Sequence, residues 1–103
     1  MRLYIAGPMT GYEYFNYPAF RFAEQQLRSA GFDVLNPVDA EQHNTTGAPQ
    51  AWDWYMRHAL RMVVDSDGVA LLNGWEQSRG AQLENHVATS LGMPVRPIAG
   101  WLA

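Results

Sequence analysis

Short apolar segments alternate along this chain with longer segments whose apolar residues recur at helical spacing. Residues 2–6 are mostly apolar and end at Gly7-Pro8, which predicts a first strand. A helix is expected to start near Pro18 and to end at Gly31. Its apolar positions recur at spacings of three and four: Phe20, Ala23, Leu27 and Ala30. Residues 32–35 then predict a second short strand, which Asn36-Pro37 ends.

The second half of the chain repeats this alternation after a polar stretch over residues 38–50, which predicts a long loop. Residues 51–64 predict a second helix, and the continuous apolar run over 68–72 is typical of a strand covered on both faces. A third helix is expected over residues 80–91, and a last strand over 95–98. The apolar stripes of the two helices comprise Trp52, Tyr55, Met56, Ala59, Leu60 and Val63, and Leu83, Val87 and Leu91.

Strand–helix alternation of this kind indicates parallel strands joined by right-handed crossovers. We therefore expect one domain over residues 1–103, with a three-layer α/β fold. It would be a flavodoxin-like or Rossmann-like open parallel sheet of about four strands in the order 2-1-3-4, with helices on both faces. Ligands of such sheets bind at the carboxyl ends of the strands, where the strand order reverses. That rule singles out the loops over residues 7–11 and 73–80.

Composition narrows the classes of function. The net charge is −3 and no block of lysine or arginine occurs, so we expect that the protein does not bind double-stranded nucleic acid. The absence of cysteine excludes disulfides, zinc–thiolate sites and cysteine nucleophiles. The apolar start is too short for a signal peptide or a membrane span, so we expect a cytoplasmic protein.

Large aromatic side chains are abundant, at 13% of the residues with four tryptophans, which is more than a small core easily holds. Some of them are expected in a ligand pocket or at a subunit interface. The C-terminal segment 97–102 is apolar for a chain end, and one interpretation is that it docks against a second subunit.

The first loop permits a tight turn and close approach of a ligand to its backbone, because it has a glycine at each end. It has neither a Walker motif nor a dinucleotide fingerprint. It is either a plain turn or a binding loop, and its place at the switch point favours binding. Its residues are Gly7, Pro8, Met9, Thr10 and Gly11.

The second loop leads into the third helix, whose N-terminus attracts anions. Ser78 or Gly80 could cap this helix, and Glu84 follows within it. Glu84 either complements the helix dipole or faces the crevice, where the helix terminus would hold it ionised as a nucleophile. Trp75 is either a hydrophobic lid over the core or a platform for a base.

The three histidines, His43, His58 and His86, lack the spacing of a metal site. We expect neither a metal ion nor a cofactor.

Several segments together resemble the nucleoside 2-deoxyribosyltransferase-like proteins, most closely a small, uncharacterised branch found in phages and bacteria. The similarity covers almost the whole chain, and its most specific part is Gly-Trp-Glu-x-Ser-x-Gly-Ala-x-x-Glu. The segments are Tyr4-Ile5-Ala6-Gly7-Pro8-Met9-Thr10-Gly11, then Asn16, Phe20 and Gly31, Asn36-Pro37, Tyr55-Met56-Arg57, Asp67, Leu71-Leu72-Asn73-Gly74-Trp75-Glu76-Gln77-Ser78-Arg79-Gly80-Ala81-Gln82-Leu83-Glu84, Ala88 and Gly92-Met93-Pro94-Val95.

This resemblance implies a flavodoxin-like homo-oligomer that binds a deoxynucleoside or its monophosphate. Glu84 would attack the anomeric carbon and form a deoxyribosyl ester, which another base or water then resolves. The loop from Gly7 to Gly11 would line the pocket and could hold a 5′-phosphate, and Ser78 would lie near the sugar or phosphate.

One departure from the family pattern affects the chemistry. Relatives carry an aspartate on the second helix that helps to protonate or orient the base, and the matching residue here is Ala59. Either His58 or Asp53 substitutes for it, a neighbouring subunit supplies the acid, or the acid is missing. The main hypothesis is thus an N-glycosyl hydrolase or deoxyribosyltransferase. The alternatives are a catalytically weak or inactive nucleotide-binding module, a scaffold for another protein and, more weakly supported, cleavage of an NAD-like ribosyl bond.

Overall fold

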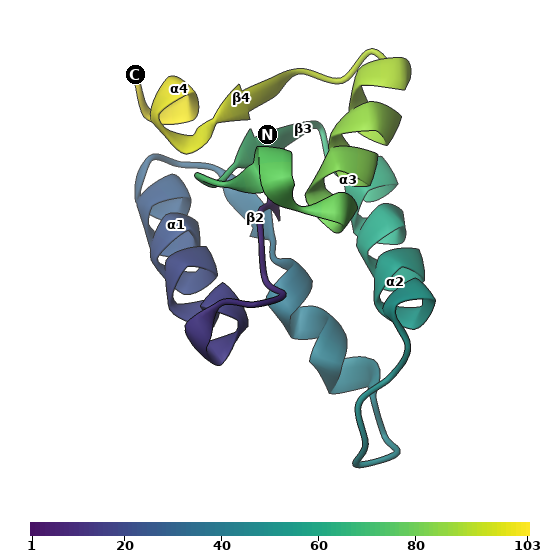
Figure 1. The fold of residues 1–103 in the computed structure, drawn as a ribbon. Coiled ribbons are helices and arrows are strands. Elements are labelled where there is room, and N and C mark those ends of the chain that lie inside the picture. The colour runs from purple at the N-terminus through teal and green to yellow at the C-terminus, as the bar shows by residue number, and fades with distance from the viewer.

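The computed structural model describes all 103 residues as a four-stranded sheet between two layers of helices (Figure 1). The strands are β1 (Arg2–Ala6), β2 (Asp33–Leu35), β3 (Gly68–Leu71) and β4 (Val95–Pro97). The α-helices are α1 (Tyr17–Ser29), α2 (Trp52–Asp65), α3 (Arg79–Ser90) and α4 (Ile98–Leu102). Three short 3₁₀ helices are η1 (Glu13–Asn16), η2 (Pro37–His43) and η3 (Trp75–Gln77). None of these helices combines the length and apolar character that crossing a membrane requires.

The sheet is parallel throughout and its strand order is β2-β1-β3-β4. This confirms the predicted α/β fold and the order 2-1-3-4. The switch point lies between β1 and β3, so the connections after these two strands meet at the carboxyl end of the sheet.

Alternate residues of β1 enter two separate cores. Leu3 and Ile5 pack beneath α1 and α4 on one face, whereas Tyr4 and Ala6 pack beneath α2 and α3 on the other. Figure 1 shows the two helix pairs on opposite sides of the sheet. We call these the α1 face and the α3 face.

The first helix follows its sequence pattern closely. Phe20, Ala23 and Leu27 are buried, and Pro18 lies in the first turn, where a missing N–H costs nothing. Gly31 ends the helix at φ 96°, a left-handed conformation that favours glycine.

The predicted loop over residues 38–50 is partly wrong, because η2 occupies its first half. The side chain of Asn36 accepts a hydrogen bond from the Val38 N–H and starts this helix. The Asn36 carboxamide is itself buried, and its NH₂ group donates to the Phe20 carbonyl and to Glu24. A turn sequence followed by polar residues does not reveal such a network.

The buried face of α3 differs from the apolar stripe that the sequence predicted for this helix. The buried residues are Ala81, Glu84 and Ala88, whereas Leu91 is 59% exposed. The small alanines allow α3 to approach the sheet closely, and this places a glutamate on the core side of the helix.

The C-terminal segment packs within its own chain, and its docking on a second subunit stays a prediction. Residues 98–102 form α4, and Trp101 is buried in the α1-face core. Its indole N–H donates to the Val69 carbonyl at 2.9 Å.

Candidate functional site

A carboxyl group and a phenol meet inside the α3-face core. Glu84 is 5% exposed and Tyr4 is fully buried. The Tyr4 hydroxyl donates a hydrogen bond to Oε2 of Glu84. Because these residues are 80 positions apart, only the packing of α3 on β1 brings them together.

Burial raises the pKa of Glu84 to about 8, although the hydrogen bond from Tyr4 acts to lower it. The pKa of Tyr4 is likewise raised, first by burial and then by the charge of Glu84. The expectation that the helix terminus holds Glu84 ionised is therefore wrong. Glu84 is the sixth residue of α3, and the favourable effect of a helix N-terminus on anions fades beyond the first turn.

The connection from β3 to α3 contains η3 and the start of the helix. Ser78 caps α3, because its hydroxyl oxygen accepts a hydrogen bond from the Ala81 N–H at 3.1 Å. Of the two caps predicted from the sequence, Ser78 and Gly80, this confirms Ser78. The Arg79 guanidinium lies 3.9 Å from the ring centroid of Trp52. Gly80 lies against α2, because a Cβ there would come within 3.1 Å of the Met56 sulfur.

The connection from β1 to α1 is held in an unusual backbone conformation. Tyr14, Phe15 and Asn16 all have positive φ angles, between 51° and 61°, although none is glycine. Left-handed backbone costs a non-glycine residue roughly 1–2 kcal/mol. The Asn16 side chain anchors the segment by donating to the Pro8 carbonyl at 3.0 Å.

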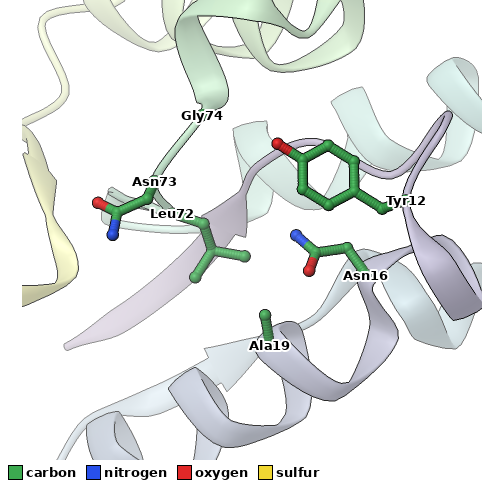
Figure 2. Close-up of a pocket in the computed structure, with 6 residues that line it drawn as sticks. All are labelled: Tyr12, Asn16, Ala19, Leu72, Asn73 and Gly74. Carbon is green, nitrogen blue, oxygen red and sulfur yellow. The ribbon is translucent and has the colours of Figure 1, made fainter.

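The two connections meet and border an open cavity of about 360 Å³ at the protein surface (Figure 2). Its lining residues are Tyr12, Asn16, Ala19, Leu72, Asn73 and Gly74. We call it the switch-point cavity. A second cavity of about 340 Å³ shares Ala19, Leu72 and Asn73 with it and continues between α1 and α4. Glu84 lines neither of these two cavities.

The residues predicted for ligand binding lie in different surroundings. Pro8 is buried and Met9 packs partly against the α1-face core, whereas Thr10 and Gly11 are exposed. The backbone of Gly7 fits tightly against β3, since a Cβ there would lie 2.7 Å from the Leu72 side chain. None of the residues from Gly7 to Gly11 lines the switch-point cavity.

Trp75 is partly buried and packs against the α3-face core, as the lid interpretation expects. A role for Trp75 as a platform for a base stays a prediction.

The two candidate substitutes for the missing aspartate lie away from the Tyr4–Glu84 pair and make no hydrogen bond to it. The His58 ring stacks on that of His43, with centroids 5.1 Å apart, and its pKa is lowered by burial and then by His43. Asp53 is exposed and lies 4.0 Å from Arg57. Ala59, at the aspartate position, is buried in the α3-face core beside Tyr4.

Sequence reasoning missed Tyr4, Tyr12 and Asn16. A signal for Tyr4 was present, because a phenol within a fully buried strand needs a hydrogen-bond partner. Asn16 belongs to the segments that resemble the family, but no signal gave it a place in a site, and none marks Tyr12. The positions of both residues depend on the left-handed backbone over residues 14–16.

Residues 1–96 match the model of a protein family described as a domain of unknown function, DUF4406. The chain belongs to this family. Among solved structures, this DUF4406 protein is similar to a 2-deoxyribosyltransferase from the psychrotolerant bacterium Bacillus psychrosaccharolyticus, with a TM-score of 0.65. The two chains are 22% identical, and the match covers 92% of this chain and 69% of the other. At this identity the likeness establishes a shared fold. No curated protein sequence matches the DUF4406 chain.

Proposed function

We propose that this protein cleaves or exchanges the N-glycosidic bond of a deoxynucleoside or a deoxynucleoside monophosphate, with Glu84 as the nucleophile. The observation that carries the proposal is the buried Tyr4–Glu84 pair on a deoxyribosyltransferase-like fold. A carboxyl group with so perturbed a pKa, hydrogen-bonded to a second titratable group, is typical of reactive sites.

In the first step the ionised Glu84 carboxylate attacks the anomeric carbon of the sugar. A bond forms between its oxygen and that carbon, while the bond from carbon to base nitrogen breaks. The base leaves with the electron pair and takes up a proton. Water or a second base then attacks the same carbon and gives up a proton to solvent, while the ester bond between that carbon and Glu84 breaks. This restores the carboxylate and releases free deoxyribose or a new deoxynucleoside.

Glu84 must lose its proton before it can attack, because a pKa of about 8 leaves roughly a tenth of the groups ionised at pH 7. The Tyr4 hydroxyl stabilises the resulting carboxylate by donating to it. Binding also requires η3 and the start of α3 to move, because Glu84 is nearly inaccessible to solvent. In this proposal Ser78, Gly80 and the loop from Gly7 to Gly11 contact the sugar or its phosphate.

Protonation of the leaving base lacks an evident donor within the chain. Ala59 has no proton to give, and neither His58 nor Asp53 is hydrogen-bonded to the Tyr4–Glu84 pair. Loss of a general acid lowers rates by about 10²–10⁴-fold. This favours the alternative function, a nucleotide-binding module with weak or no catalysis, unless a neighbouring copy in a homo-oligomer supplies the acid.

The enzymatic function is tested by incubating the protein with each deoxynucleoside and its monophosphate and measuring free base by chromatography. Glu84→Gln should release base at least a hundredfold more slowly than wild type, because an amide cannot form the ester. Asp65→Asn, at the exposed last residue of α2, is the matched control and should keep wild-type activity. Equal rates for wild type and Glu84→Gln would refute the role of Glu84.

The binding-module alternative is tested by thermal unfolding with the same ligands. A nucleotide that raises the melting temperature without any release of base supports a binding module. Release of base that depends on Glu84 rules it out.

A further inference from the structure

The switch-point cavity and Glu84 lie on opposite faces of the same sheet. Leu72 packs against the α1-face core, and Ala19 belongs to α1. Glu84 instead bonds to Tyr4 within the α3-face core. The protein therefore has a hollow at the carboxyl end of its sheet that the proposed catalytic pair does not explain.

The walls of this cavity suit a flat ring. Tyr12 extends across it from the β1–α1 connection, and its hydroxyl approaches Gly74 in the β3–η3 connection (Figure 2). A Cβ at position 74 would lie 2.8 Å from that hydroxyl, so a larger residue there would displace the Tyr12 side chain. Ala19 and the Leu72 side chain supply apolar surface below the tyrosine ring.

One edge of the cavity offers hydrogen bonds. Because the Asn16 NH₂ group donates to the Pro8 carbonyl, the orientation of the carboxamide is fixed. Its Oδ1 makes no hydrogen bond within the protein and is free to accept one from a ligand, and the Tyr12 hydroxyl is also unbonded. The Asn73 carboxamide points away from Tyr12 and Asn16.

None of the six lining residues is charged. A phosphate or a carboxylate would find no cation there, so the chemistry of the cavity favours a neutral occupant. An aromatic face, apolar surface and a few fixed polar groups are the usual lining of a small-molecule site.

We propose that the switch-point cavity binds a neutral, planar heteroaromatic ring stacked on Tyr12, the chemistry that a free nucleobase and the base of a nucleoside share. Asn16 Oδ1 accepts a hydrogen bond from an amino or imino group at the edge of the ring. The choice of a nucleobase as the ring rests on the proposed function, whereas the location rests on the cavity alone.

The test is calorimetric titration of the protein with adenine, cytosine, the matching deoxynucleosides and 2-deoxyribose 5-phosphate, which lacks a ring. Tyr12→Ala should weaken the binding of free bases about tenfold, because it removes the stacking surface. Tyr12→Phe should keep the affinity within about threefold. Leu91→Ala is the control, because Leu91 follows α3, is 59% exposed and lines neither cavity.

A second variant, Ala19→Leu, fills the cavity from α1 and should abolish binding of the free base, whereas Gln25→Leu on the exposed side of α1 should not. Binding of bases that survives both Tyr12→Ala and Ala19→Leu overturns the proposal, as does the absence of any base binding by the wild-type protein. Binding of 2-deoxyribose 5-phosphate that is lost in Ala19→Leu also contradicts it.

The two proposals can fail separately. If bases bind through Tyr12 but no glycosidic bond is cleaved, the ring site stands and the enzymatic function falls. If base release depends on Glu84 but Tyr12→Ala leaves the affinity for free bases unchanged, the enzymatic function stands and the ring site falls.

Discussion

At the scale of single residues, the most consequential feature is that a carboxylic acid is buried with a phenol as its hydrogen-bond partner and without a cation. Desolvation disfavours the charged form, so Glu84 retains its proton at neutral pH. The sequence placed Glu84 near the start of a helix beside apolar residues. It did not indicate the partner or the protonation state, because both depend on a contact across 80 residues.

Glu84 should make the folded state less stable as pH rises. Its pKa is raised from 4.5 to about 8, so between these values the folded state binds the proton more tightly than the unfolded state. The stability that this proton confers is complete below pH 4.5 and is lost as pH rises to 8. From pH 5 to pH 8.5, the free energy of unfolding of Glu84→Gln should therefore increase by a few kcal/mol relative to that of wild type, at about 1.4 kcal/mol per pKa unit.

Urea denaturation of both proteins at the two pH values measures this difference, and contributions from other titrating groups cancel in the comparison. Parallel stability curves for wild type and Glu84→Gln would mean that Glu84 is ionised in the folded protein.

Tyr4→Phe should shift the pH dependence of base release to higher pH. The Tyr4 hydroxyl stabilises the carboxylate and lowers the pKa of Glu84, so its removal raises that pKa further. When rates are measured from pH 6 to pH 10, the rate of the variant should begin to rise at a higher pH than that of wild type. At the alkaline end it should approach the wild-type rate. A uniform loss of rate at every pH would show that Tyr4 only supports the packing around Glu84.

At the scale of elements, helix starts and ends followed their sequence signals best. Ser78 before α3, Pro18 in the first turn of α1 and Gly31 after it all lie where capping rules expect them. The 3₁₀ helices η1 and η2 were not predicted. They depend on the buried Asn36 side chain and on left-handed residues before α1, which no periodic pattern reveals.

Ser78 separates a structural role from a binding role. Ser78→Ala removes the cap of α3 and should lower the free energy of unfolding by about 1 kcal/mol. Ser78→Asp preserves the cap, so its stability should stay near that of wild type.

The added charge of Ser78→Asp should nevertheless weaken binding of a deoxynucleoside monophosphate if Ser78 lies beside its phosphate. Affinity for the deoxynucleoside itself is the internal control. Equal losses for the nucleoside and the monophosphate would place the phosphate elsewhere.

At the scale of the whole molecule, the sheet order was predictable because strands and helices alternate with few exceptions. The role of the C-terminus was not, since an apolar chain end suits either a core or an interface. The hydrogen bond from Trp101 to Val69 and the contacts of its ring place Trp101 in the core, whereas an interface formed by the rest of the segment stays a prediction.

Trp101→Ala should lower the free energy of unfolding by about 3–5 kcal/mol, a large share of the total stability of a domain of this size. Leu102→Ala, at a neighbour that is 38% exposed, should cost less. Chemical denaturation measures both, and sedimentation shows whether association changes. A Trp101→Ala variant that keeps its stability but loses self-association would mean that Trp101 serves an interface and not the core.

β1 contributes alternate side chains to both cores and lies between β2 and β3, so it has no edge open to solvent. If one helical layer detaches, it uncovers one face of β1, but the hydrogen bonds of β1 to β2 and β3 remain. We expect these bonds to break only when both layers are lost. In deuterated water the amide hydrogens of β1 should therefore be the last to exchange, and their rates report the opening of the entire domain.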